Sequence, residues 1–247
     1  MPRYDFRTPR LFVEEPLALG ASIAMNKNQS NYLANVLRLS PGDPVLVFNG
    51  RDGEWRAEIE RDGRKSVALS VAEATRPQER PTDLHYLFAP LKHARLDYMV
   101  QKAVELGVSR LQPVTTRHTQ ATRVNLDRMR ANAIEAAEQC GILTIADVAD
   151  TMPLPKALGL LGNERTLIFC DEDAQTRDPA VALSSVHRMS PLAVLIGPEG
   201  GFADDERTLL LRHPNVIRLA LGPRILRADT AAVAALTLVQ ATLGDWR

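Results

Sequence analysis

A short apolar run that opens into a glycine-rich loop constrains this chain more than any other stretch. Leu192–Ile196 (LAVLI) predicts a buried β-strand. It stops at Gly197–Gly201 (GPEGG), where proline fixes its own φ and glycine can take a positive φ without a Cβ clash. A helical pattern, Asp204–Arg212, follows. This order of strand, loop and helix predicts an α/β protein with a ligand crevice at the carboxyl ends of its strands.

The same order of elements returns about twenty residues later. The apolar strand Val216–Leu221 breaks at Gly222-Pro223, and RILRADT then leads into an Ala-rich helix. Exposed backbone N–H and C=O groups in such loops can read the edge of a planar heterocycle. We therefore expect the two loops to form two walls of one pocket.

Charged and capping residues surround the second break. Arg224 and Arg227 stand just before a helix N-terminus, where the helix dipole favours anions. Asp229 and Thr230 are residue types that cap helices, so capping alone explains them. The helix Thr230–Leu243 is apolar around much of its circumference and is expected to be buried.

The N-terminal part of the chain has the pattern of a small β-rich domain. A helical pattern at Gln29–Leu39 precedes three strand-like runs, VLVFNG, EWRAEIE and SVALSVAE. Turn signals at Gly50–Gly53 and Asp62-Gly63 separate these runs, as in hairpins. The polar, proline-containing stretch Arg76–Pro81 is typical of a linker. We expect two domains, residues 1–74 and residues 75–247.

From Leu84 onward the pattern alternates between strands and helices. Leu84–Pro90 and Arg110–Val114 are expected strands, and Lys92–Leu106 and Leu126–Gln139 are expected helices. With a further strand at Thr166–Cys170, this series predicts a mostly parallel sheet covered by helices.

Charge and composition narrow the class of protein. The net charge is zero, yet residues 76–130 carry 10 Lys and Arg against 5 Asp and Glu. This basic segment is compatible with an anionic partner such as nucleic acid, and equally with solvated helix faces. No apolar run approaches the roughly 20 residues of a membrane span, and the charged N-terminus lacks an apolar signal segment. We expect a cytoplasmic protein that binds no membrane.

Several kinds of site lack their sequence signature. There is no GxGxxG after the first α/β strand, no GxxxxGK[ST] and no GxSxG. Cys140 and Cys170 are expected to be reduced thiols, and the five histidines have no metal-ligand spacing, so no metal is expected. Asp171–Asp173 follows a strand and either faces a pocket or forms a solvated acidic loop.

The two loops, LIGPEGGF and LGPRILRADTA, resemble the signature of the ribosomal RNA small subunit methyltransferase E family in the SPOUT superfamily. Further blocks of that family are similar to segments along nearly the whole chain: Arg10–Phe12, Val36–Arg38 with Pro41–Asp43, Gln101–Val108 and Glu135–Gly141. Together these blocks are specific, whereas any one of them would be weak.

The resemblance implies a fold and a reaction. The expected fold is an N-terminal PUA-like RNA-binding β-barrel (1–74) and a C-terminal trefoil-knotted SPOUT domain (75–247), one of the rare exceptions to un-knotted topology. The implied reaction is methylation of uridine N3 in 16S ribosomal RNA of the 30S subunit, with S-adenosylmethionine as donor and a homodimer as the working form.

The resemblance also assigns residues. The cofactor-binding residues it implies are Leu195, Ile196, Gly197, Pro198, Glu199, Gly200, Gly201, Leu219, Leu221, Gly222, Arg224, Ile225, Leu226, Ala228 and Thr230. Arg227 is the first choice for stabilising the developing uridine anion, and Arg10 is a second catalytic candidate. Arg10 and Arg38 are candidates for gripping RNA phosphate or the target base, against surface roles, and Lys92 and Arg95 are further RNA-binding candidates.

The chain departs from the family pattern at two places. The family usually has Thr-Glu-Thr where this chain has Ala228-Asp229-Thr230, and usually has Arg after Gln-Cys-Gly where this chain has Ile142. These departures are the only support for one alternative, a non-catalytic RNA-binding or ribosome-assembly factor. A second alternative is a SPOUT methyltransferase that acts on another RNA, against which the N-terminal β domain and the order of the blocks along the whole chain favour ribosomal RNA.

Overall fold

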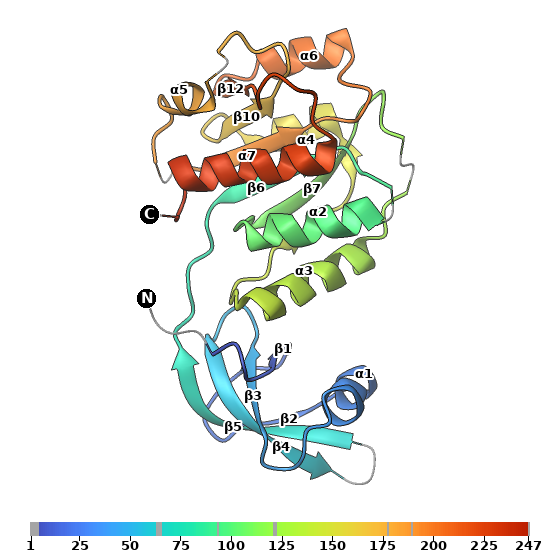
Figure 1. Ribbon diagram of the computed structural model, residues 1–247, viewed down its shortest axis with the longest axis vertical. Helices are drawn as coiled ribbons and strands as arrows, with labels where there is room; N and C mark the ends of the chain where they lie inside the picture. The colour runs from blue at the N-terminus through green and yellow to red at the C-terminus, as the bar shows by residue number, and fades with distance from the viewer. Residues whose placement is uncertain are drawn as a thin grey trace. The chain divides into compact units, whose positions relative to one another are not determined.

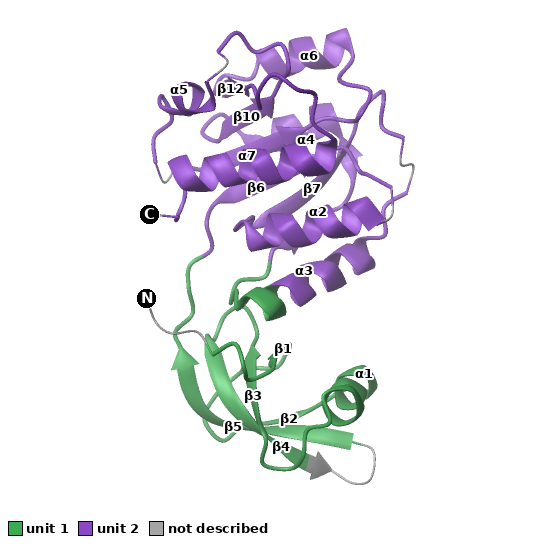
Figure 2. Ribbon diagram, in the orientation of Figure 1, with its two compact units in different colours: residues 1–80, 137–145 green, residues 81–136, 146–247 purple. Residues whose placement is uncertain are grey.

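The computed structural model describes residues 5–62, 66–92, 94–120, 123–176, 178–188 and 190–246. The chain divides into two compact units (Figure 2). Unit 1 contains Met1–Arg80 and Ala137–Ile145, and unit 2 contains Pro81–Ala136 and Ala146–Arg247. The predicted turn residue Gly63 and helix residue His93 lie outside the described residues.

Unit 1 is built on one five-stranded sheet with the strand order β1-β3-β4-β5-β2 (Figure 1). The strands are β1 (Arg10–Phe12), β2 (Ser22–Ala24), β3 (Pro44–Phe48), β4 (Glu54–Asp62) and β5 (Ser66–Arg76). β1 pairs with β3 in parallel and the other pairs are antiparallel. Register shifts between β4 and β5 at Glu54/Trp55 and Arg56/Ala57 mark irregularities, which bend and twist a strand pair.

The core of unit 1 follows the alternation of its strands. Alternate side chains in the middle of β4 and β5 point inward, so that Ala57, Ile59, Leu69 and Val71 join one apolar cluster. Leu33 covers this cluster from the expected helical segment. That segment begins at α1 (Lys27–Asn31), which Asn26 caps, and continues as a π-helical turn, Tyr32–Val36.

A segment far along the chain also belongs to unit 1. Residues 137–145 contain the end of α3 (Leu126–Cys140) and the loop after it. The Arg76 guanidinium donates to the Gly141 carbonyl oxygen at 2.9 Å, and the Gln78 amide donates to that of Leu143 at 3.2 Å. The unit is therefore discontinuous in sequence.

Unit 2 is built on a parallel sheet with the strand order β12-β10-β11-β6-β7-β8, and β9 also pairs with β7. The strands are β6 (Leu84–Phe88), β7 (Arg110–Thr115), β8 (Asp147–Val148), β9 (Met152–Pro153), β10 (Thr166–Cys170), β11 (Leu192–Ile196) and β12 (Val216–Leu219). All of its described strand pairs are parallel. β10, β11 and β6 are buried between other elements, which explains their continuous apolar sequences.

Helices cover both faces of the unit 2 sheet (Figure 1). They are α2 (Ala94–Glu105), most of α3, α4 (Leu154–Leu161), α5 (Pro179–Leu183), α6 (Asp204–Leu211) and α7 (Ala228–Thr242). Apolar residues of α4 and α6 pack with Phe169 and Leu195 on one face. α7 packs on β11 and α2, and the Tyr86 hydroxyl contacts the Met99 sulfur of α2 at 3.0 Å.

The α/β prediction, with a mostly parallel C-terminal sheet and a small N-terminal β-rich part, is confirmed. Within the described ranges, no helix is both long and apolar enough to cross a membrane. The expected domain limits, 1–74 and 75–247, stay a prediction: β5 runs on to Arg76, and unit 1 includes residues 137–145.

Candidate active site

The two glycine loops follow β11 and β12, two strands of the unit 2 sheet that are separated by one strand. β11 ends at Ile196 and its loop leads to α6 at Asp204, while β12 ends at Leu219 and its loop leads to α7 at Ala228. β10 lies between these two strands and pairs in parallel with both. All three carboxyl ends therefore meet at one edge of the sheet, where α/β proteins bind their ligands.

A cleft of about 570 Å³ opens between the loops. Its lining residues are Cys170, Asp171, Glu172, Ile196, Gly197, Pro198, Glu199, Gly200, Gly201, Phe202, Leu219, Leu221, Gly222, Arg224, Ile225, Leu226, Arg227, Ala228 and Ala231. The set includes Arg227 and all the residues proposed for the cofactor except Leu195 and Thr230.

Those two residues occupy different surroundings. Leu195 is fully buried in the core cluster beneath β11, because alternate strand residues point to opposite faces. Thr230 is exposed in the first turn of α7. Neither Asp229 nor Thr230 is the N-cap residue of α7: Arg227 holds that position without a side-chain cap bond. The Asp229 carboxylate does accept from the Thr230 amide in the first turn, at 3.0 Å.

The loops need their glycines. A Cβ on Gly197 would overlap the ring of Phe202, which packs edge-on against Phe169. Gly222 has a φ of 101°, a backbone conformation that is strained for every residue except glycine. Both loops thus hold conformations that bring backbone to the cleft.

The cleft combines apolar walls with charges of both signs. Ile196, Leu219 and Ala228 are buried apolar residues of its walls. The charged residues Glu172, Glu199, Arg224 and Arg227 also line it. Such a site could hold a planar heterocycle together with a group that carries both charges.

Asp171 anchors the floor of the cleft, a role that the sequence left open. Its carboxylate is fully buried and contacts Arg207 at 2.7 Å and Arg218 at 2.6 Å. These two pairs tie the end of β10 to α6 and to β12, the elements that carry the two loops. Asp173 is largely exposed instead. The sequence signal for this role is Arg218, a charged residue inside the otherwise apolar strand β12, because such an arginine requires a nearby carboxylate.

The surroundings of Cys170, next to Asp171, raise the pKa of its thiol. Cys170 lines the cleft, and burial raises the pKa of its thiol to about 12, with a smaller contribution from the adjacent Asp171 charge. Cys140 is exposed. No cluster of potential metal ligands occurs among the described residues.

Two further segments of unit 2 contact the first glycine loop. The Arg95 guanidinium of α2 bonds the Glu199 carboxylate at 2.7 Å. After β7, the His118 ring nitrogen Nδ1 lies 3.0 Å from the Gly201 carbonyl oxygen. Lys92 is exposed just before α2. Of the RNA-binding candidates, Lys92 and Arg95 therefore lie in the unit that carries the cleft.

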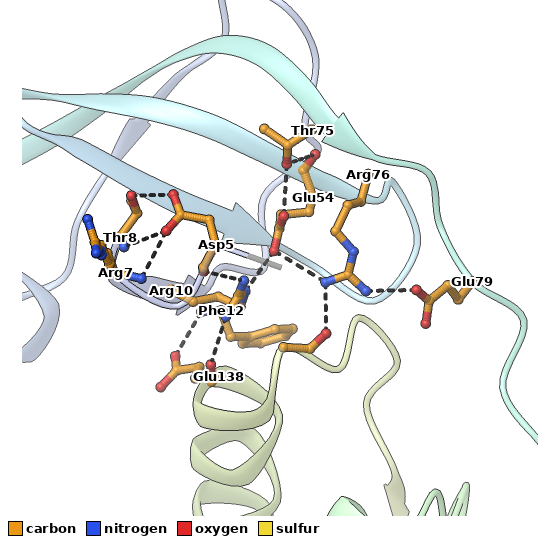
Figure 3. A network of polar contacts seen from close by, with 11 residues as sticks. Asp5, Arg7, Thr8, Arg10, Phe12, Glu54, Thr75, Arg76, Glu79 and Glu138 are labelled. Carbon is orange, nitrogen blue, oxygen red and sulfur yellow. Dashed lines mark hydrogen bonds and ion pairs between the residues drawn. The ribbon is translucent and has the colours of Figure 1, made fainter. Parts of the chain in front are cut away.

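Arg10 and Arg38 belong to unit 1 and differ from each other. Arg38 is exposed and has a φ of 57°, in the left-handed region. Arg10 is buried, and its Nε donates to Glu54 Oε2 at 2.7 Å (Figure 3). In this conformation Arg10 offers no free guanidinium to an RNA phosphate, so that role rests on the resemblance alone.

The contacts of Arg10 belong to a network around the end of α3 (Figure 3). Its Nη1 donates to the Glu138 carbonyl oxygen at 3.4 Å, and the Phe12 amide donates to Glu138 Oε1 at 2.8 Å. Arg76 lies 3.6 Å from Glu54 as well as donating to Gly141. The last carbonyl groups of a helix carry partial negative charge, so two guanidinium groups stabilise this end.

Comparison with known proteins identifies the class first. Residues 78–240 match a family described as RNA methyltransferase domain, and residues 26–72 match an RNA methyltransferase PUA domain. The chain is 30% identical to the ribosomal RNA small subunit methyltransferase E of Rickettsia conorii over 94% of both chains. It is 26% identical to that of Bacillus subtilis over 97% of this chain and 96% of the other.

A solved structure agrees with these matches. The ribosomal RNA small subunit methyltransferase E of Neisseria gonorrhoeae, bound to S-adenosyl methionine, superposes with a TM-score of 0.87 at 26% identity, covering 98% of this chain and 100% of that one. The chain belongs to the ribosomal RNA small subunit methyltransferase E family. The expected PUA-like and SPOUT classes are confirmed with it.

Proposed function

We propose that the chain transfers a methyl group from S-adenosylmethionine to N3 of a uridine in 16S ribosomal RNA of the 30S subunit. The observation that carries this proposal is the cleft between the two glycine loops, which gathers nearly all residues that the family signature assigns to the cofactor. The relatives named above supply the substrate class.

The residues of the cleft fit S-adenosylmethionine. The volume of the cleft lies within the roughly 300–1,000 Å³ of small-molecule sites. The two glycine loops offer backbone hydrogen-bond donors and acceptors to the edge of the adenine. The cofactor carries a sulfonium, an ammonium and a carboxylate group. Glu172 would face the cations and Arg224 the carboxylate, while Glu199, bonded to Arg95 at 2.7 Å, would contribute through its backbone. When bound, it supplies an electrophilic methyl group.

Arg227 is the residue proposed to stabilise the uridine anion that forms as N3 loses its proton. It is exposed at the cleft, and no described carboxylate pairs with it. A guanidinium that is not already neutralised can bond O2 or O4 of uracil as negative charge develops there. The protein otherwise contributes by holding donor and acceptor in line.

RNA binding is proposed for Arg38, Lys92 and Arg95. Arg38 and Lys92 are exposed and can approach phosphate, whereas Arg95 is partly exposed and would share its guanidinium between Glu199 and the phosphate. For Arg10, the catalytic and RNA-binding roles would require it to leave Glu54. Its buried ion pair supports a structural role in unit 1 instead.

A homodimer, a trefoil knot and a cytoplasmic location complete the proposal. α7 leaves a stripe of partly exposed side chains, Val233, Ala234, Thr237 and Leu238, which a second copy could cover. The chain passes from β7 to β10 and from β11 to β12 without pairing those strands, and such crossovers are compatible with a knot. A monomeric mass in light scattering would contradict the dimer.

The departures from the family pattern fall at informative places. Ala228 lines the cleft and is buried, so the loss of a Thr side chain there enlarges the cleft. Ile142 lies in the segment of unit 1 after α3. Neither change removes a charged group from the described cleft, which favours a retained activity.

The experiment that tests this function compares two glycine variants. Gly200→Val places a branched side chain at the cleft, where even a Cβ lies 3.3 Å from His118, whereas Gly159→Val, in open space on α4, is the control. We expect Gly200→Val to lose S-adenosylmethionine binding in calorimetry, and tritium transfer to unmethylated 30S subunits, with an unchanged far-UV CD spectrum. Retained binding in Gly200→Val would contradict the site.

A further inference from the structure

The cofactor cleft occupies only part of the carboxyl edge of the unit 2 sheet. β6 pairs with β11 and β7 pairs with β6, both in parallel, so their carboxyl ends continue the same edge. The segments after β6 and β7 carry Lys92 and His118. Arg95, at the start of α2, and His118 contact the first glycine loop at Glu199 and Gly201.

The hydrogen bond of His118 defines which ring nitrogen is free. A carbonyl oxygen only accepts, so the Gly201 oxygen at 3.0 Å requires a proton on Nδ1. In the neutral ring Nε2 then carries a lone pair, and the side chain is exposed. A Cβ placed on Gly200 would lie 3.3 Å from the His118 Cβ, so His118 stands against the rim of the cleft.

The charged groups around His118 are paired with one another. Arg117 bonds Asp205 at 2.7 Å through its side chain and Glu206 at 2.8 Å through its backbone amide, both on α6. On the glycine loop, Glu199 is bonded to Arg95 at 2.7 Å. Thr116 and Thr119, in the same loop as His118, bond each other. No described carboxylate pairs with the imidazole, which leaves Nε2 available to a substrate.

We propose that residues 89–92 after β6 and residues 116–120 after β7 form the subsite for the acceptor nucleotide, in which the His118 imidazole takes up the N3 proton of uridine. This inference rests on the proposed function. The N3 proton moves to Nε2, and N3 uses the freed electron pair to bond the methyl carbon. The electron pair of the broken carbon–sulfur bond stays on sulfur, and the imidazolium later returns its proton to water. Lys92 would contact the phosphate of the same nucleotide.

The test uses a variant that keeps the structural bond of His118 and loses only its basicity. In His118→Asn the side-chain amide can donate to the Gly201 oxygen as Nδ1 does, but it cannot accept a proton. His187→Asn, at another exposed histidine of unit 2, is the matched control. Methyl transfer to unmethylated 30S subunits is measured from pH 6 to pH 9 with and without added imidazole, alongside calorimetric binding of S-adenosylmethionine and filter binding of the subunits.

We expect His118→Asn to lose roughly 10²–10⁴-fold in kcat with both binding constants unchanged, since positioned general bases contribute about that much. Added imidazole should restore part of the rate, and the deficit should shrink as alkaline pH ionises uridine unaided. Activity of His118→Asn within about threefold of His187→Asn would overturn the inference, as would a matching loss of binding without rescue. No transfer by the wild-type protein would overturn the proposed function, and the inference with it.

Discussion

The buried Glu54 carboxylate should be the most sensitive charged group of unit 1. It is 3% exposed, lies 2.7 Å from the Arg10 Nε and 3.6 Å from Arg76, and accepts from the Thr75 hydroxyl at 2.9 Å. Glu54→Ala leaves the Arg10 guanidinium, itself 4% exposed, without a counter-ion. Breaking a buried ion pair on one side costs about 3–5 kcal/mol, so we expect a loss of that size in the free energy of unfolding.

The assay uses the two tryptophans of the chain. Trp55 lies in unit 1 and Trp246 in unit 2, so Trp55 reports the unfolding of unit 1 in urea when Trp246 is replaced by Phe. Glu73→Ala is the matched control, because Glu73 lies on the adjacent strand, is 59% exposed and pairs with Arg56 at 3.3 Å. An exposed pair contributes only about 0–1 kcal/mol.

Two results would refute this reasoning. One is an unfolding free energy of Glu54→Ala within about 1 kcal/mol of Glu73→Ala at an unchanged denaturant slope. The other is an unaltered hydrogen exchange of residues 137–145, since Arg10 and Arg76 donate to the carbonyl groups there. Replacing both Arg10 and Glu54 by Leu should recover much of the loss, because no uncompensated charge remains.

Three further expectations follow from other parts of the structure. Arg227→Ala should lower kcat at least about 100-fold while the dissociation constant for S-adenosylmethionine changes less than about threefold, and equal losses in both would show a role in building the cleft instead. His85 should make unit 2 sensitive to acid. Desolvation, and secondarily the Arg165 charge, lowers the pKa of His85 to about 4, so the unfolded state binds the proton more readily. Neutral His85 therefore costs no stability above pH 6.5, its pKa in the unfolded chain. As the pH falls from 6.5 toward 4, the free energy of unfolding should drop by an amount on the order of 2 kcal/mol. His85→Gln should make the urea midpoint depend less on pH in that range. Iodoacetamide at pH 8 should alkylate exposed Cys140 quickly and the partly exposed Cys170, whose pKa is raised to about 12, at least tenfold more slowly, as peptide mass spectrometry would show. Equal rates would contradict the raised pKa of the Cys170 thiol.

Local patterns were sufficient to predict most of the longer elements and the loops that line the cleft, but not the short elements β2, β8, β9 and α5. Apolar runs between glycine and proline breaks located β10, β11 and β12, and the two glycine loops do line one cleft. Such signals are contained within a few neighbouring residues, so a single sequence reveals them.

Contacts between distant positions could not be predicted in the same way. Arg10 lies 44 positions from Glu54 and 128 from Glu138, and nothing in the periodicity of either segment indicates the partner. The same holds for Asp171, whose partner Arg218 lies 47 positions away, and for the inclusion of residues 137–145 in unit 1. A buried charge requires a counter-ion, but the sequence does not say which one.

The central claim is that this cleft serves methylation of uridine at N3, and the position of the new methyl group tests it most directly. The wild-type protein would be incubated with tritiated S-adenosylmethionine and 30S subunits that lack the modification, and the RNA then digested to nucleosides. The account predicts that the label elutes as 3-methyluridine and that Gly200→Val yields none. Label in 5-methyluridine, in a 2′-O-methyl nucleoside or in a cytidine would contradict it.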